Sequence, residues 1–188
     1  MSKNKLPKWE TKNKEFIHDF KIFDGYVKTS YHPVWNKESK YALLDSPDWV
    51  NICPITKKNE IVLVKQFRHG VDEFTLEIPG GLKEKGEDPR KAAERECLEE
   101  TGFSGPDDAI YIGKTYPNPA FLNNTCYSYL WTDCEQTQEQ ALEGNEEIEV
   151  VKLPVSKLKE YIDDFKIQNS LVLNGIFFFL MKKGLLDE

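Results

Sequence analysis

The chain has 188 residues, of which 39% are hydrophobic and 12% aromatic, and this is enough apolar material for a folded domain rather than a disordered chain. Its net charge of −7 argues against nucleic acid as a main partner, because phosphate backbones select basic surfaces. It leaves room for a small phosphorylated substrate, which metal ions and a few local cations can hold.

No signal peptide, membrane partner or membrane span is expected. The stretch MSKNKLPKWETKNK lacks an apolar core, and the longest apolar run, SLVLNGIFFFLM, is far shorter than the roughly 20 residues that a span requires. That run is typical of a buried helix. The four cysteines form no Cys-x-x-Cys pair, so we expect reduced thiols in a cytoplasmic protein.

Residues 1–47 show an alternation that favours antiparallel strands. Four residues are expected on one side of a strand: Phe16, His18, Phe20 and Ile22. Such a segment cannot bury both faces of its strands alone, so we expect two or three antiparallel strands that pair with another element, for which a second subunit is one source. The turn at residues 45–49 marks a boundary. We therefore expect a β-strand dimerisation segment at 1–47 and a main domain at 48–188.

The main domain reads as strands, one helix, more strands and two helices. The expected strands are 49–56, 60–70, 74–81, 109–119, 124–134 and 146–154. The expected helices are 89–101, 155–165 and 170–183. Asp88 and Ser170 are predicted N-caps, and Gly102 and Gly184 are predicted helix ends. This order predicts an α+β or mixed-sheet α/β layout.

The helix at 89–101 carries an unusual concentration of carboxylates, namely Glu94, Glu96, Glu99 and Glu100. Helical spacing puts Glu96 and Glu100 on one face a turn apart, with Glu99 beside them. Carboxylates at this spacing suit Mg²⁺ or Mn²⁺, although an acidic helix facing solvent would show the same charges. The preceding loop adds Glu87 and three glycines, and Arg95 can fix a carboxylate through a forked hydrogen bond.

The spacing of these residues resembles the Nudix box, G-x5-E-x7-R-E-U-x-E-E-x-G-U, where U is a bulky apolar residue. The fixed positions are filled by Gly81, Glu87, Arg95, Glu96, Glu99, Glu100 and Gly102, and Phe103 fills the last apolar position. Cys97 stands where Ile, Leu or Val is usual. Because Cys packs as a small hydrophobe, this departure should affect packing rather than chemistry.

The resemblance implies an α/β/α sandwich with a mixed sheet and metal-dependent hydrolysis of a nucleoside diphosphate linked to another group. It assigns Glu96 and Glu100 as principal metal ligands, with Mg²⁺ or Mn²⁺ as cofactor. Further ligands would come from Glu87, Glu99 and the carbonyl oxygen of Gly80. Arg95 would orient the carboxylates.

The segment before the box resembles the ADP-ribose and nucleoside-diphosphate-sugar pyrophosphatase branch. It shows a Q-x-R pattern, Gln66 and Arg68, and a glutamate, Glu77, ahead of the Pro-Gly. Arg68 is a candidate phosphate contact or a structural ion pair, and Glu77 is a candidate for positioning the substrate or Arg68, or a plain strand-end carboxylate. Members of this branch are usually homodimers with exchanged N-terminal strands.

A later loop, EGNEEIEV, is expected to return to the box. Glu146 fits the position of a further metal ligand and possible base in this branch. Gly144 stands where some members hold the general base, so that role stays open among Glu143, Glu147 and a metal-bound hydroxide. An acidic surface loop would look the same.

The segment YPNPAFLNNTCY contains Asn118 and Asn123, which are candidates for binding sugar hydroxyls. Asparagines also make turns without any ligand. The expected activity is hydrolysis of nucleoside diphosphate sugars, including ADP-ribose, to a nucleoside monophosphate and a sugar phosphate. The alternatives are another Nudix substrate, such as a dinucleoside polyphosphate or NADH, and a non-catalytic nucleotide-binding module. The last is disfavoured because every carboxylate of the box is present.

Overall fold

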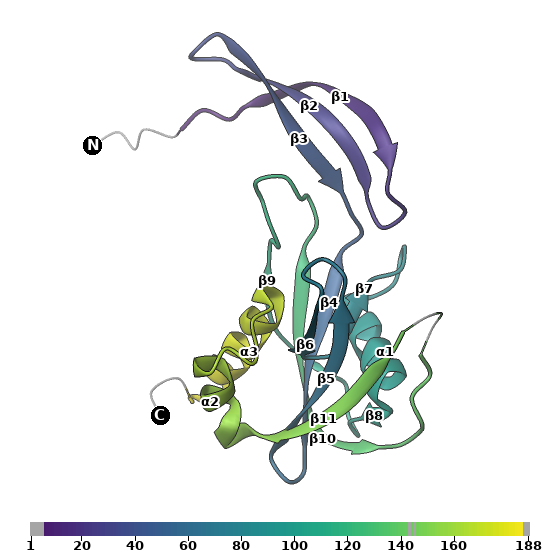
Figure 1. Cartoon of the computed structure of the whole chain (residues 1–188). Helices are drawn as coiled ribbons and strands as arrows, with labels where there is room; N and C mark the ends of the chain where they lie inside the picture. The colour runs from purple at the N-terminus through teal and green to yellow at the C-terminus, as the bar shows by residue number, and fades with distance from the viewer. Residues whose placement is uncertain (1–5, 143, 145, 186–188) are drawn as a thin grey trace, which may run out of the picture. The chain divides into compact units, whose positions relative to one another are not determined.

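A computed structural model of the chain describes residues 6–142, 144 and 146–185 (Figure 1). These residues form two compact units. One contains the described residues up to Pro47 together with Tyr116–Asn124, and the other contains Asp48–Thr115 and the chain from Thr125 onward. The N-terminal unit therefore includes the loop Tyr116–Asn124, which lies far from residues 6–47 in the sequence.

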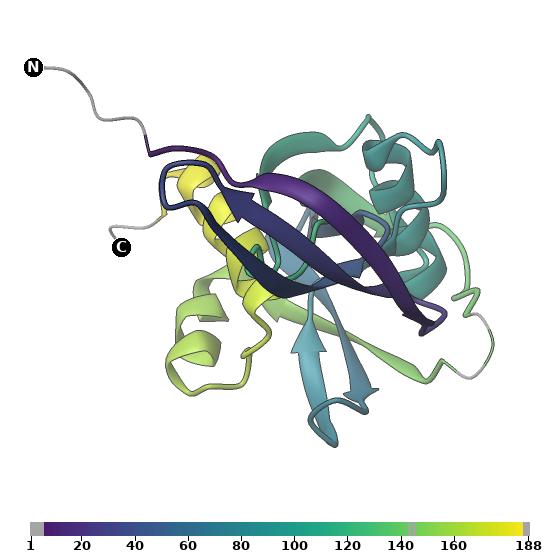
Figure 2. The same cartoon turned by 90° about the horizontal axis from the view of Figure 1, so that it is seen from above.

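The N-terminal unit is built on an antiparallel sheet of β1 (Glu10–Asp19), β2 (Asp24–His32) and β3 (Lys37–Asp45), in that spatial order (Figure 2). Every residue of β1 is exposed, although the strand pairs with β2 along one edge. The strand ends at Asp19, however, so two residues expected on its face, Phe20 and Ile22, lie in the turn instead. The reason is that the Phe20 and Ile22 backbones bond across a tight turn rather than to β2.

The second unit contains one mixed sheet with the strand path β11-β5-β4-β10-β8. Three short strands extend it, because β6 pairs with β5, β7 with β4 and β9 with β10. The bounds are β4 Trp49–Thr56, β5 Glu60–Arg68, β6 Glu73–Glu77, β7 Gly80–Leu82, β8 Phe103–Ser104, β9 Ile110–Thr115, β10 Cys126–Gln136 and β11 Ile148–Pro154. Strand β10 runs parallel to β4 and the other pairs are antiparallel.

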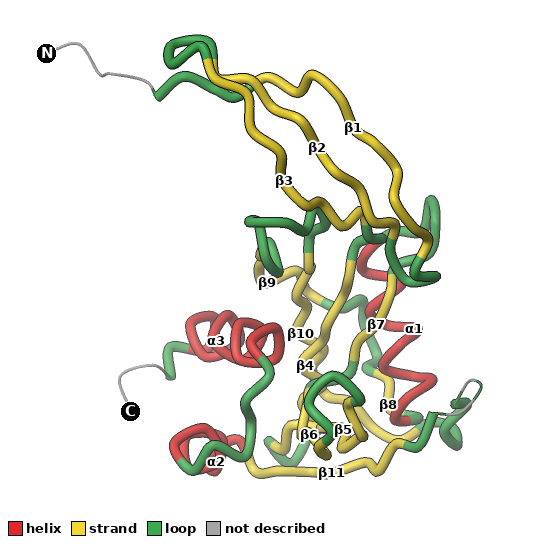
Figure 3. Tube along the Cα trace, turned by 45° about the horizontal axis from the view of Figure 1, so that its top comes forward, coloured by secondary structure: helices red, strands yellow, loops and turns green. Residues whose placement is uncertain are grey.

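Helices cover both faces of this sheet (Figures 1 and 3). Helix α1 (Pro89–Thr101) lies on one face, and α2 (Leu158–Asp163) and α3 (Ser170–Lys183) lie on the other. Strand alternation sends Val62 into the core under α1 and Leu63 into the core under α3. The unit is thus a three-layer α/β/α sandwich with a mixed sheet, as expected.

The helix ends follow local sequence signals, with one correction. Asp88 caps α1 by accepting from the Arg90 and Lys91 amides, and Gly102 ends it in the left-handed region at φ 74°. The N-cap of α3 is Asn169 rather than Ser170, because the Asn169 carboxamide accepts the Leu171 amide at 3.0 Å. The expected helix 155–165 is shorter than predicted, since Val155–Lys157 forms a 3₁₀ turn before α2.

None of the helices among the described residues combines the length and the apolarity needed to cross a bilayer. The four cysteines are free and buried. Cys97 lies on the fully buried side of α1, and its thiol donates to the Phe103 carbonyl oxygen at 3.5 Å. The departure from the box consensus is therefore accommodated as core packing.

Candidate active site

Strand β7 forms the floor of the candidate site because its glycines allow close backbone approach. Gly80 and Gly81 pair with Asn51 and Val50 of β4. A Cβ on Gly80 would lie 2.3 Å from the Val50 carbonyl oxygen, so only glycine permits this pairing. Gly81 faces α1, and a Cβ there would lie 2.6 Å from the carboxylate carbon and both oxygens of Glu96. The Glu96 carboxylate thus rests directly against the glycine strand.

Replacing Gly81 by alanine is expected to displace the Glu96 carboxylate and to lower kcat/KM about tenfold to a hundredfold, with little loss of thermal stability, because a side-chain end can move while backbone cannot. Steady-state kinetics and thermal melts on purified Gly81→Ala would measure both. Gly70→Ala is the matched control, since no atom lies within 4 Å of a Cβ there and its backbone is not in the left-handed region. Equal activity of Gly81→Ala and wild type would contradict the placement of Glu96.

Glu100 is the most enclosed carboxylate of the acidic helix. Sequence reasoning placed it on an exposed helix face, but the structure buries it to 6% exposure between α1 and β7. Its Oε2 accepts the Gly80 amide at 3.0 Å. Burial raises the pKa of Glu100 to about 8, and the charges of Glu96 and Glu146 add to the rise. A nearby cation would stabilise the charged form of Glu100, which burial disfavours.

Arg95 gathers the other carboxylates of the box. It binds both oxygens of Glu87 through Nε and Nη2, at 3.0 and 3.1 Å. Its Nη1 donates to Glu96 at 2.9 Å and to Glu99 at 3.0 Å, while Nη2 also donates to the Leu82 carbonyl oxygen. The hydrogen bonds from Arg95 lower the pKa of Glu87. The orienting role expected of Arg95 is consistent with these contacts, which span the loop and the helix.

Arg68 lies on β5 and forms a fork with Glu77 of β6, with Nε and Nη2 each 2.8 Å from a carboxylate oxygen. Hydrogen bonding to Glu77 raises the pKa of Arg68, and the charges of Glu100 and Glu146 raise it further. The guanidinium is therefore within electrostatic range of the acidic helix. These contacts fit the structural ion pair, and a phosphate contact by Arg68 stays a prediction.

Glu146 lies close enough to the acidic helix for its charge to act on Glu96. Burial is the main cause of the raised pKa of Glu96, and the charge of Glu146 adds to it. It lines a groove of about 420 Å³ with Lys65, Phe74, Leu142, Glu147, Ile148 and Glu149. Glu143, the other candidate base, lies outside the described residues. The structure therefore places these charged side chains close enough to change one another's pKa values: Arg68, Glu77, Glu96, Glu100 and Glu146.

Asn118 and Asn123 belong to the N-terminal unit rather than to the unit that carries the carboxylates. Asn118 accepts the Ala120 amide in a local turn. Asn123 uses both ends of its amide, donating to Asp45 at 2.8 Å and accepting from the Ser46 amide at 3.2 Å. These contacts give Asn118 a place in a turn and Asn123 a link to the end of β3, and substrate contact stays a prediction for both.

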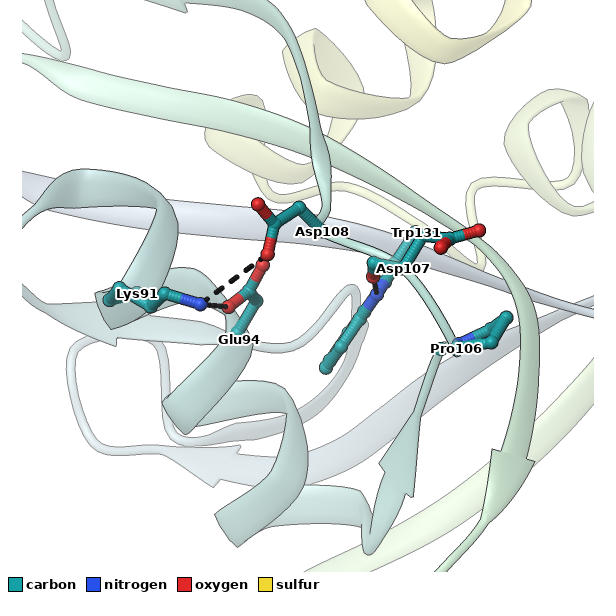
Figure 4. Close-up of a pocket in the computed structure, with 7 residues that line it drawn as sticks. Lys91, Glu94, Pro106, Asp107, Asp108 and Trp131 are labelled. Atoms are coloured by element: carbon teal, nitrogen blue, oxygen red, sulfur yellow. Dashed lines mark hydrogen bonds and ion pairs between the residues drawn. The ribbon is translucent and has the colours of Figure 1, made fainter.

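Glu94, the fourth carboxylate of the helix, has a structural role. It accepts the Ala109 amide at 2.9 Å and pairs with Lys91 at 2.8 Å. Figure 4 shows it lining a pocket of about 640 Å³ with Lys91, Gly105, Pro106, Asp107, Asp108 and Trp131. The Trp131 indole donates to the Asp107 carbonyl oxygen, and Lys91 also reaches Asp108. The charges of this pocket satisfy one another.

The donor set of the candidate site suits a hard divalent cation. Within the part of the chain that the structure describes, no group of three or more His, Cys, Asp or Glu side chains is placed so that it could hold a metal ion. Two features nevertheless fit a cation: the donors are all oxygens, and burial raises the pKa of Glu96 and Glu100, so a cation beside them would stabilise their charged forms. Glu87, Glu146 and the Gly80 carbonyl can add oxygen donors.

Sequence reasoning missed three residues of this region, namely Asn51, Thr75 and Asn169. Thr75 stands two residues before Glu77 in a strand, so alternation alone could have placed both on one face. Asn169 precedes Ser170 and was overlooked as a cap. Asn51 gave no signal, because its contact with the Leu171 carbonyl oxygen joins residues far apart in the chain.

A mixed sheet between helices, with an acidic helix facing a glycine strand, defines a metal-assisted site for phosphate compounds. The NUDIX domain profile matches residues 46–171, and the chain belongs to that family.

Relatives span most of the chain. An ADP-ribose pyrophosphatase of Bacillus subtilis is 28% identical over 92% of each chain. An ADP-sugar pyrophosphatase of Mus musculus is 30% identical over 69% of this chain and 63% of its own. A crystal structure of an ADP compounds hydrolase superposes with a TM-score of 0.82 over 97% of this chain and 99% of its own, at 21% identity, and this shows the shared fold.

Proposed function

We propose that the protein hydrolyses the pyrophosphate bond of nucleoside diphosphate sugars, ADP-ribose included, to a nucleoside monophosphate and a sugar phosphate. The observation that carries this proposal is the complete carboxylate set of the Nudix box, of which Arg95 binds Glu87, Glu96 and Glu99, with the charge of Glu100 acting on Arg68. The names of the Bacillus subtilis and Mus musculus relatives support the substrate class.

The carboxylates, oriented by Arg95, would hold the metal ions of this reaction. Mg²⁺ or Mn²⁺, when bound, neutralises the pyrophosphate and lowers the pKa of an attached water. The ligands would be the Gly80 carbonyl and the carboxylates of Glu87, Glu96, Glu100 and Glu146. Arg95 holds Glu87, Glu96 and Glu99 in fixed orientations.

The remaining side chains handle the substrate and the proton. Arg68, fixed by Glu77, binds a phosphate oxygen. Glu99 and Glu146 are more accessible than Glu100, so they are the groups to which we assign uptake of the proton from the attacking water. Glu147 is the further candidate for that role.

A substrate screen tests the proposal. Purified protein would be incubated with Mg²⁺ or Mn²⁺ and with ADP-ribose, ADP-glucose, GDP-mannose, UDP-glucose, a dinucleoside tetraphosphate and NADH, and released phosphomonoester would be read by a coupled phosphatase. We expect turnover of diphosphate sugars. Turnover of the dinucleoside tetraphosphate or NADH alone would show that diphosphate sugars are not the substrate class. No turnover of any compound with either metal would favour a nucleotide-binding module.

We also propose a cytoplasmic homodimer. Four buried free cysteines suit a reducing compartment. Strand β1 exposes an unpaired edge and large apolar side chains, with Phe16 and Ile17 54% and 55% exposed.

At micromolar concentration, light scattering is expected to give the mass of a dimer. Exchanging both Phe16 and Ile17 for lysine is expected to give monomers, because charge would then replace the apolar contact. Lys12→Ala on the same strand is the control. A monomeric wild-type protein would exclude the dimer.

A further inference from the structure

The strongest unassigned feature is the set of donors that converges on Glu77. This carboxylate is 3% exposed and lies at the end of β6. Besides the fork from Arg68, it accepts the Thr75 hydroxyl at 2.6 Å. Burial acts to raise the pKa of Glu77, and Arg68, Thr75 and the Asn169 side chain act together to lower it. A buried carboxylate with this many donors is held in one position.

Sheet register explains how these groups meet. Strands β5 and β6 are antiparallel, and Val64 pairs with Glu77, Gln66 with Thr75 and Arg68 with Glu73. Paired residues point to the same face, so Thr75, Glu77 and Arg68 share one side of the sheet. The hydroxyl and the guanidinium therefore approach the same carboxylate, and both of them bind its Oε1.

Asn169 connects this pair to helix α3. Its carboxamide oxygen caps the helix by accepting the Leu171 amide, and the same side chain helps to lower the pKa of Glu77. The first turn of α3 is tied to the site a second time, since the Leu171 carbonyl oxygen accepts from Asn51, which pairs with Gly80. The start of the helix thus fixes Glu77 on one side and the glycine strand on the other.

A fixed Glu77 also fixes the side chain of Arg68. Its Nε and Nη2 are committed to Glu77, while Nη1 takes no part in the fork. The side chain is 45% exposed although its partner is buried, so one edge is anchored and the other reaches solvent. A guanidinium held in this way loses little freedom when it binds a phosphate oxygen.

We infer that Thr75 and Asn169 are positioning residues that fix Glu77 and thereby aim the guanidinium of Arg68 at a phosphate of the substrate. This inference rests on the proposed function. An interaction present in both the ground state and the transition state changes KM and leaves kcat nearly unchanged, whereas damage to the metal ligands lowers kcat.

The test uses Thr75→Val and Asn169→Ser with the best substrate of the screen. Valine keeps the β-branched shape of threonine without the hydroxyl, and serine keeps the N-cap oxygen without the amide donor. Each variant is expected to raise KM about tenfold with kcat within about twofold of wild type. Thr75→Ser restores the hydroxyl and is expected to restore KM.

Binding supplies a second readout. Affinity for the non-hydrolysable α,β-methylene analogue of ADP-ribose, measured by calorimetry in EDTA, is expected to fall by the same factor in Thr75→Val and to return in Thr75→Ser. Thermal melts of all variants should match wild type. Unchanged KM and affinity in both variants, with an active wild type, would overturn the positioning role alone. A wild type without any turnover would overturn the proposed function, and this inference with it.

Discussion

Glu100→Gln is expected to reduce kcat about a thousandfold while the protein stays folded, because the variant removes the charge that a divalent cation would neutralise. The side chain is nearly isosteric, and its amide oxygen can still accept the Gly80 amide, which Glu100 Oε2 accepts at 3.0 Å. Burial already disfavours the charged form of this acid, whose pKa is raised to about 8. Neutral glutamine should therefore not lower the melting temperature.

The matched control is Glu94→Gln on the same helix. Glu94 contacts Lys91 and the Ala109 amide in the pocket of Figure 4, away from the glycine strand. Its loss should leave kcat within about twofold of wild type. Initial rates over a range of Mg²⁺ and Mn²⁺ concentrations, with circular dichroism as the fold check, measure the contrast. A folded Glu100→Gln protein with near-normal kcat would refute the metal assignment of Glu100.

Arg95→Lys is expected to lower kcat about a hundredfold, although it keeps the positive charge. One guanidinium contacts Glu87, Glu96, Glu99 and the Leu82 carbonyl oxygen, and a single ammonium group cannot reproduce that geometry. The carboxylates should lose their fixed orientation. Since the fork also ties the loop to the helix, we expect the melting temperature to fall by about 2–4 °C.

Arg90→Lys provides the comparison for this variant. Arg90 lies on the same helix and pairs with Glu94 and Asp108. Its replacement should change neither kcat nor KM beyond about twofold. If Arg95→Lys behaved like Arg90→Lys, the arginine would be a surface ion pair and the orienting role would be wrong.

Local signals predicted much of the fold. Asp88, Pro89 and Gly102 specify where α1 begins and ends, because capping bonds and left-handed backbone involve residues only a few positions apart. The same kind of signal failed at α3, where Asn169 and Ser170 are both good caps and only the chain direction at the turn selects the first. In β1 the alternation was read past Asp19, because a turn of apolar residues has the same pattern as a strand.

The sequence by itself determined the carboxylate set, its spacing on one helix and the family to which the chain belongs, since these depend on residue types at short separations. Tertiary structure decided which carboxylates are enclosed, as the burial of Glu100 requires β7 to lie against α1.

It also decided the surroundings of Arg68, because sheet register brings Glu77 to Arg68 and Thr75 to Glu77, and Asn169 acts on Glu77 from the start of α3. Asn123 looked available as a ligand, and its contacts with Asp45 and Ser46 join residues more than seventy positions apart. The physical reason is the same in each case. Periodicity fixes the face on which a residue lies, whereas burial and partners depend on which distant segment packs against that face.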